Sequence, residues 1–180
     1  MKKVVIVGAG LAGSYMAYTL GTKGYSVEVF EKREDPRSAS YGSGRSINLV
    51  VGHRGWTALK YAGIEEPIRE IVVPAHGRQI HDIEGNESYF PYSIKGKAIH
   101  SISRSEFNKK LVELADSLPN VNLHFNTSCS GVDTKAGIAY FNNNEGPIEV
   151  KADLIVGADG AGSAVRKSLQ GIPRFNFSQE

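Results

Sequence analysis

Hydrophobic and polar positions follow two periods along this chain, and together they predict an α/β protein. Residues 4–7 form an unbroken β-branched run, which is typical of a strand buried on both faces. A helix-compatible run follows at 11–20, Gly24 breaks it, and residues 26–30 predict a second strand. Strand, helix and strand in this order predict a βαβ unit.

The middle of the chain predicts two helices and then short strands. Helical spacing at 53–62 stops at Gly63, and 64–72 predicts a second, shorter helix. From Pro74 the pattern changes to short alternating segments separated by turn residues, at 77–83, 87–93 and 97–103. These segments predict an antiparallel excursion from the first sheet.

The last third of the chain predicts a return to the first sheet. Ser103-Arg104-Ser105-Glu106 matches a capping box, with Phe107, Leu111 and Leu114 marking the buried face of the helix. Further strands are expected at 121–125, 138–141, 148–150 and 153–156, and a short helix at 163–169. We therefore divide the chain into a βαβ core (1–73), antiparallel strands (74–103) and a return to the first domain (104–180).

Three glycines carry the first chemical signal. Gly8, Gly10 and Gly13 follow the first strand with G-x-G-x-x-G spacing. This spacing permits a tight turn, close approach of a pyrophosphate and close packing of the helix on the strand. Glu31 ends the second strand 18 residues after Gly13, where a carboxylate accepts hydrogen bonds from a ribose. The set predicts a dinucleotide site; the alternative is a glycine-rich turn in another α/β domain.

The acid at the end of the second strand narrows the choice of dinucleotide. A carboxylate at the ribose repels a 2′-phosphate, so Glu31 disfavours NADP at this site. The motif leaves both FAD and NAD open.

Composition excludes several other classes of protein. The net charge is +2, from 21 basic and 19 acidic residues, which gives no electrostatic case for nucleic acid. No apolar run reaches the roughly 18 residues that a transmembrane helix needs. Cys129 is the only cysteine, as in proteins of reducing compartments, and we expect a cytoplasmic protein. His53, His81 and His100 have no metal-ligand spacing, so we expect no metal site.

Four segments taken together resemble a known family. They are GAGLAG at 8–13, GRSINL at 44–49, SISR at 101–104 and DLIVGADGAGSAVR at 153–166. This set resembles the flavoprotein aromatic hydroxylases. The pairing of GRSINL with His53-Arg54-Gly55, and of Ile80-His81 with Pro91-Tyr92, together with Pro173-Arg174-Phe175, is similar to the branch that hydroxylates kynurenine.

The resemblance implies a fold and a reaction. The fold is a Rossmann-like FAD-binding domain with an inserted antiparallel β excursion. The reaction is hydroxylation of L-kynurenine to 3-hydroxykynurenine through a flavin C4a-hydroperoxide, with bound FAD, NADPH as reductant and O2 as co-substrate. The flavin carries this chemistry, so no side chain is assigned as a catalytic residue.

The resemblance also implies site residues. Those expected to bind the cofactor are Gly8, Gly10, Leu11, Ala12, Gly13, Glu31, Arg33, Arg45, Arg104, Cys129, Asp159 and Gly160. Arg78 and Tyr92 are expected to hold the amino-acid end of kynurenine. Five of these residues have a plainer alternative: Arg45 and Arg104 as surface arginines, Arg78 as an exposed strand residue, Tyr92 as edge packing and Asp159 as a helix cap.

The family's second flavin-contacting motif, of the type Gly-Asp-Ala-Ala-His, does not occur in this chain. We therefore expect the N-terminal portion of a longer enzyme that does not hydroxylate kynurenine by itself. Two alternatives stay open: a related FAD hydroxylase of another aromatic acid, and a non-catalytic fragment that binds FAD or ADP.

Overall fold

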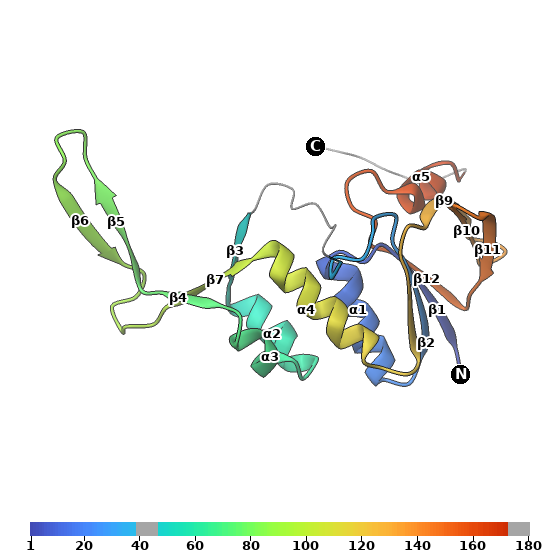
Figure 1. Cartoon of the computed structure of the whole chain (residues 1–180), viewed down its shortest axis with the longest axis horizontal. Helices are drawn as coiled ribbons and strands as arrows, with labels where there is room; N and C mark the ends of the chain where they lie inside the picture. Colours follow the sequence, from blue (N-terminus) through green and yellow to red (C-terminus); the bar gives the residue numbers. More distant parts are fainter. Residues whose placement is uncertain (39–46, 173–180) are drawn as a thin grey trace. The chain divides into compact units, whose positions relative to one another are not determined.

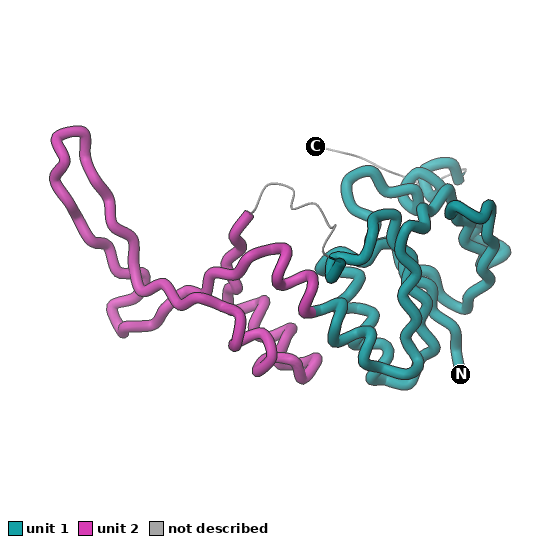
Figure 2. The backbone as a smooth tube through the Cα atoms, in the orientation of Figure 1, with its two compact units in different colours: residues 1–42, 111–180 teal, residues 43–110 magenta. Residues whose placement is uncertain are grey.

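The computed structural model describes residues 1–38 and 47–172. The chain divides into two compact units (Figure 2). Unit 1 comprises residues 1–42 and 111–180, and unit 2 comprises residues 43–110. Within the described ranges, no helix is both long enough and apolar enough to cross a membrane.

Unit 1 is built on a four-stranded parallel sheet with the order β12-β1-β2-β8 (Figure 1). Its strands are β1 (Lys3–Val7), β2 (Ser26–Phe30), β8 (Val121–His124) and β12 (Leu154–Gly157). Helix α1 (Leu11–Thr22) connects β1 to β2 and completes the predicted βαβ unit. Strand β12 pairs with β1 although 150 residues separate Lys3 from Asp153, whose carboxylate accepts the Lys3 amide at 2.7 Å.

Alternate residues of β1 pack into two separate hydrophobic cores. Val4 and Ile6 pack with Ala17 of α1, and Val5 and Val7 pack on the opposite face. This opposite face is covered by a three-stranded antiparallel sheet of the order β11-β10-β9 and by α5 (Ala164–Gln170). Burial on both faces explains why β1 reads as a continuous apolar run.

The antiparallel sheet of unit 1 includes a strand that the sequence pattern did not predict. Its strands are β9 (Ser128–Asp133), β10 (Ile138–Asn143) and β11 (Gly146–Lys151). Strand β9 is polar and glycine-containing, and its register against β10 shifts between Tyr140 and Phe141. Such an irregular strand lacks the alternation by which strands are found in a sequence.

Unit 2 contains a three-stranded antiparallel sheet of the order β3-β7-β4 and a separate hairpin (Figure 1). The sheet strands are β3 (Asn48–Val51), β4 (Val73–Ala75) and β7 (Ile99–Ser103). The hairpin joins β5 (Gly77–His81) to β6 (Glu87–Pro91). Between β3 and β4 lie α2 (His53–Tyr61) and α3 (Glu65–Arg69).

The predicted antiparallel pairing is confirmed, and the partners of its third strand are now defined. Strand β7 pairs with β3 and β4, whereas β5 and β6, among the strands that the structure describes, pair only with each other. The helix predicted at 64–72 is shorter, because β4 begins at Val73. Helix α4 (Arg104–Asp116) begins where the Ser-Arg-Ser-Glu pattern predicted, although the Ser103 hydroxyl bonds to that of Ser105. The three-part division at 73 and 103 stays a prediction.

Candidate dinucleotide site

The loop between β1 and α1 is shaped by two glycines that no other residue could replace. Gly8 has φ of +100°, and a Cβ at this position would lie 2.5 Å from the carbonyl oxygen of Ala158. A Cβ at Gly13 would lie 1.8 Å from the carbonyl oxygen of Gly8. These contacts hold α1 close to the carboxyl end of β1, as the spacing predicted.

Gly10 differs from its two neighbours in the motif. It is the N-cap residue of α1 with φ of −72°, and a Cβ there would meet no atom of the described residues within 4 Å. The space beside Gly10 is therefore open, in the place where the motif admits a pyrophosphate.

The N-terminus of α1 offers free donors to an anion. Gly10 makes no side-chain cap bond, and the first turn contains no acidic residue. The first intrahelical bond runs from Ser14 N to Gly10 O at 2.9 Å, which leaves the preceding first-turn amides, those of Leu11, Ala12 and Gly13, without an acceptor among the described residues. Such amides at the positive end of a helix bind phosphate groups.

Glu31 lies directly beside this loop. Its side chain is buried, with 6% of the residue exposed. One carboxylate oxygen, Oε2, accepts the Ala9 amide at 2.8 Å, and Oε1 accepts the Arg33 amide at 3.0 Å and Arg33 Nε at 2.9 Å. The acid that was predicted to contact a ribose thus contacts the glycine loop, and its contact with a ribose stays a prediction.

The charge of Glu31 is maintained by its donors. Burial alone raises the pKa of the carboxyl, but the hydrogen bonds from Arg33 and Ala9 and the charge of Arg33 outweigh it, so the pKa is lowered from its ordinary value of 4.5. The group is therefore a carboxylate at neutral pH, as repulsion of a 2′-phosphate requires.

The segment after Glu31 is held to the end of α4 within unit 1. Arg37 forms an ion pair with Asp35 at 2.6 Å and another with Asp116 at 2.6 Å. Asp116 is the last residue of α4, where a negative charge opposes the helix dipole. The ion pair with Arg37 offsets this unfavourable interaction at Asp116. The hydrogen bonds from Arg37 to Asp35 lower the pKa of the Asp35 carboxyl.

Comparison with known proteins shows to which family this loop and its acid belong. A family model described as an FAD binding domain matches residues 1–178. The chain belongs to this FAD-binding domain family. The predicted α/β fold and the predicted FAD-binding class are thereby confirmed.

Curated relatives give a more specific likeness. The chain is 45% identical over 181 residues to kynurenine 3-monooxygenase from Christiangramia forsetii, covering 99% of this chain and 40% of that protein. It is 39% identical to the Sus scrofa enzyme of the same name, covering 98% of this chain and 38% of the relative. The chain thus spans about 40% of the length of these relatives.

Solved structures agree on the fold. The tetrameric form of 2-methyl-3-hydroxypyridine-5-carboxylic acid oxygenase matches with a TM-score of 0.73 at 27% identity, covering 94% of this chain and 42% of that chain. The p-nitrophenol 4-monooxygenase of Pseudomonas putida DLL-E4 matches with a TM-score of 0.74 at 22% identity, over 94% of this chain and 44% of that chain. This second likeness concerns the fold alone.

The remaining predicted cofactor residues of this FAD-binding domain lie in different places. In the Asp159-Gly160 pair, Gly160 has φ of +76°. The Asp159 carboxylate accepts hydrogen bonds from the N-terminal end of α5. Its Oδ1 accepts Ser163 Oγ at 2.6 Å, and its Oδ2 accepts the Ala164 amide at 2.7 Å. The plainer alternative, a cap on this helix, therefore describes the contacts of the Asp159 side chain.

Cys129 lies on β9, packed beside the core that contains Phe141 and Val165. Burial raises the pKa of its thiol, and the negative charge of Asp159 raises it further. Its Sγ donates to the Gly131 carbonyl at 3.5 Å. A protonated, packed thiol offers no charged group to a cofactor, and the predicted contact of Cys129 with the cofactor stays a prediction.

Four other predicted residues lie outside unit 1 or outside the described ranges. Arg104 is the exposed first residue of α4 in unit 2, with its amide bonded to the Ile47 carbonyl at 3.1 Å. Arg78 and Tyr92 lie on the β5–β6 hairpin of unit 2. Arg45 lies outside the described residues. Among the residues that are described, no group of three or more histidine, cysteine or acidic side chains could hold a metal.

Sequence reasoning missed three residues that shape the loop. Ala9, between the first two glycines, donates its amide to Glu31 and accepts Ser14 Oγ at 3.0 Å on its carbonyl. Ala158 blocks any side chain at Gly8. The signal in the sequence was Ser14, a polar residue within the helix-compatible run at 11–20, and it is fully buried in the structure.

Proposed function

We propose that this chain binds the ADP half of FAD and that the enzyme containing it is an FAD-dependent monooxygenase that converts L-kynurenine to 3-hydroxykynurenine with NADPH and O2. One observation carries the proposal: an open glycine, free helix amides and a buried carboxylate converge at the end of β1 in an FAD-binding domain. The names of the curated relatives support the substrate.

The residues of unit 1 fit the dinucleotide. Gly10 leaves room for the pyrophosphate, and the amides of Leu11 and Ala12 donate to its oxygens. Glu31 offers a charged acceptor to the adenosine ribose. When bound, FAD supplies the redox chemistry that transfers an oxygen atom from O2 to an aromatic ring, while the chain positions and shields it.

The hairpin of unit 2 supports a carboxylate-bearing substrate. Arg78 pairs with Phe90 across the hairpin, and Tyr92 lies two residues beyond Phe90, so the three side chains share one face. The Tyr92 amide donates to the His76 carbonyl at 2.9 Å, which extends the hairpin ladder by one step. A guanidinium and a phenol hydroxyl on one face would suit the α-amino-acid end of kynurenine, because a guanidinium presents a planar fork to a carboxylate.

The first test is calorimetric titration of the chain with FAD, ADP and NADP. We expect ADP and FAD to bind and NADP to bind most weakly, because Glu31 repels a 2′-phosphate. Tightest binding of NADP would contradict the proposal.

The second test concerns the substrate and uses the enzyme that contains this chain. Arg78→Lys should raise the KM for L-kynurenine about tenfold or more, since an ammonium cannot replace a bidentate clamp. The matched control is Gln79→Asn on the opposite face of the same strand, for which we expect an unchanged KM. Equal kinetics in the two variants would remove Arg78 from the substrate site.

A second candidate is a hydroxylase of another aromatic acid. The structural likeness to 2-methyl-3-hydroxypyridine-5-carboxylic acid oxygenase favours it. Chromatography of the products from a panel of aromatic acids separates the two candidates. Formation of 3-hydroxykynurenine as the main product supports the first, and turnover of other acids without kynurenine turnover supports the second.

A further inference from the structure

The carboxylate of Glu31 is shared between two parts of the site. Its Oε2 accepts the Ala9 amide at 2.8 Å, and its Oε1 accepts both the main-chain amide and Nε of Arg33. A carboxylate has about four lone-pair positions, so these three donors leave about one for a ribose hydroxyl. A residue that served only the ribose would not have most of its accepting capacity taken by the protein.

The contact to Ala9 fixes the centre of the glycine loop. The Ala9 amide is held by Glu31, and the Ala9 carbonyl accepts the Ser14 hydroxyl at 3.0 Å. Both side chains are buried, and Ala9 itself is 1% exposed. Because Ala9 directly precedes Gly10, fixing both its peptide groups sets the direction of Gly10 and of the first amides of α1.

We infer that Glu31 is a positioning residue for the phosphate-binding loop, in addition to any contact with the ribose. The inference rests on the proposed function, because it assumes that the loop binds the pyrophosphate of a dinucleotide. It predicts that a change at Glu31 weakens binding of a nucleotide that has no ribose hydroxyl to contact.

Glu31→Gln tests this inference because both carboxylate oxygens of Glu31 accept hydrogen bonds from the chain. A glutamine has one accepting oxygen and one donating amide group. Its oxygen should turn toward Arg33, which presents two donors, and its amide group then faces the Ala9 amide. The substitution keeps the shape of the side chain and removes the acceptor from the loop.

The measurement compares ADP with 2′,3′-dideoxy-ADP by calorimetric titration of folded chain. We expect Glu31→Gln to weaken both ligands, each by about tenfold, the effect of one lost hydrogen bond to a charged group. Weakening of ADP alone, with dideoxy-ADP unchanged, would show that Glu31 acts on the ribose and would overturn the inference while leaving the proposed function intact. Failure of the unaltered chain to bind ADP or FAD would contradict the proposed function itself.

A matched control and a second variant complete the test. Glu28→Gln makes the same exchange three residues earlier, on β2, at a carboxylate bonded to His124 and Asn122, and should leave both affinities unchanged. Ser14→Ala removes the hydrogen bond to the Ala9 carbonyl, which is the second contact that fixes Ala9. This variant should bind both ligands severalfold more weakly.

Amide hydrogen exchange of Ala9 gives a second measurement. In the unliganded chain, the exchange rate of the Ala9 amide should increase in Glu31→Gln and not in Glu28→Gln. An unchanged Ala9 exchange rate in folded Glu31→Gln would also overturn the inference.

Discussion

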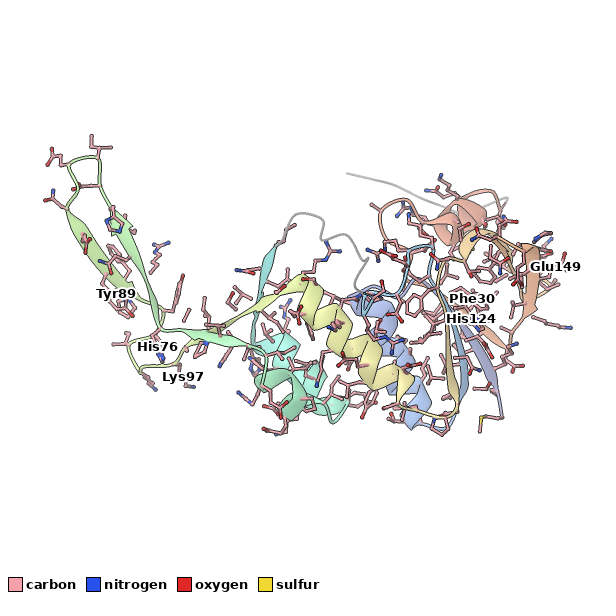
Figure 3. The ribbon with its side chains drawn as sticks, viewed as in Figure 1. Phe30, His76, Tyr89, Lys97, His124 and Glu149 are labelled. Atoms are coloured by element: carbon pink, nitrogen blue, oxygen red, sulfur yellow. The ribbon has the colours of Figure 1, made fainter. Side chains whose placement is uncertain are left out.

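The glycine loop of unit 1 and the β5–β6 hairpin of unit 2 both carry predicted site residues, but they are held by different forces. In the loop, Gly8, Ala9 and Glu31 are buried and have fixed hydrogen-bond partners. In the hairpin, both strands are exposed on both faces, and Phe90 and Tyr92 are 47% and 46% exposed. Figure 3 shows Tyr89 on this hairpin and Phe30 beside His124 in unit 1.

The two regions therefore differ in how firmly the contacts within the chain hold the predicted site residues. An isolated two-stranded hairpin is marginally stable in water, so its own contacts do not fix the positions of Arg78 and Tyr92. The guanidinium carbon of Arg78 lies 5.7 Å from the centre of the Phe90 ring, a weak contact at an exposed site. The loop, in contrast, has one arrangement because close packing and hydrogen bonds exclude others.

The largest expected effect comes from Gly13→Ala. Its new Cβ would overlap the Gly8 carbonyl oxygen, a main-chain atom that can move only with β1 or α1. We expect a loss of about 4 kcal/mol or more in the free energy of unfolding, measured with urea. Gly10→Ala is the control: its Cβ meets open space, so stability should change by about 1 kcal/mol or less while ADP binding weakens. Equal stability losses in the two variants would mean that the loop is not packed as described.

The second prediction compares one phenylalanine from each region. Phe141 is 1% exposed and stacks on Phe30 with ring centres 4.0 Å apart, so Phe141→Ala should lower the free energy of unfolding by about 3–5 kcal/mol. Phe90→Ala on the hairpin should change it by about 0.5 kcal/mol or less. A large loss in Phe90→Ala would show that the hairpin is covered by other residues in solution.

The third prediction concerns pH. The pKa of Glu31 is lower in the folded chain than its ordinary value of 4.5, so its ionisation stabilises the fold above pH 4.5. This contribution is lost as the pH falls from 4.5 through the folded pKa. Urea unfolding as a function of pH should therefore show a steeper decline in the unaltered chain than in Glu31→Gln. Parallel declines would indicate that Glu31 titrates alike in the folded and unfolded states.

The smallest expected effect is at the ion pairs of Arg37. Asp116 is 45% exposed at its side chain, so the pair is partly screened by solvent. Asp116→Asn should lower the free energy of unfolding by about 0.5 kcal/mol, and added salt should reduce the difference from the unaltered chain. The control is Asp153→Asn, whose carboxylate accepts a main-chain amide and pairs with no arginine in the described ranges, and whose effect should depend less on salt. No difference in salt dependence between the two would contradict an electrostatic role for Arg37.

Sequence patterns predicted unit 1 better than unit 2 for a physical reason. Strands β1 and β2 and helix α1 contribute buried apolar residues and close-packed glycines, which are required locally, so their patterns are strong. Strand β9 was not predicted, because its register shift against β10 interrupts the regular alternation of apolar and polar residues. The pairing of β7 with β3 and β4 depends on contacts distant in the chain, which no local pattern encodes.

The same holds for the candidate site. Gly8, Gly10, Gly13 and Glu31 were predicted from their spacing. Gly8 and Gly13 have a steric requirement within the chain and Glu31 has buried hydrogen-bond donors to accept, whereas Gly10 faces open space. Ala9 was missed because its contribution is a main-chain amide, and any residue type offers one. The helix-capping contacts of Asp159 were an open alternative, and only the hydrogen-bond geometry distinguishes a cap from a ligand contact.

The pairing of β1 with β12 also sets the order of events during synthesis. Residues 1–30 leave the ribosome with strand, helix and strand ready to pair, but the other edge of β1 has to wait for Leu154 and its neighbours. Contacts over such sequence separations slow folding, and an unpaired strand edge in the meantime can join a wrong partner. We therefore expect nascent chains that stop before β12 to need chaperone protection, although they already contain the complete glycine loop.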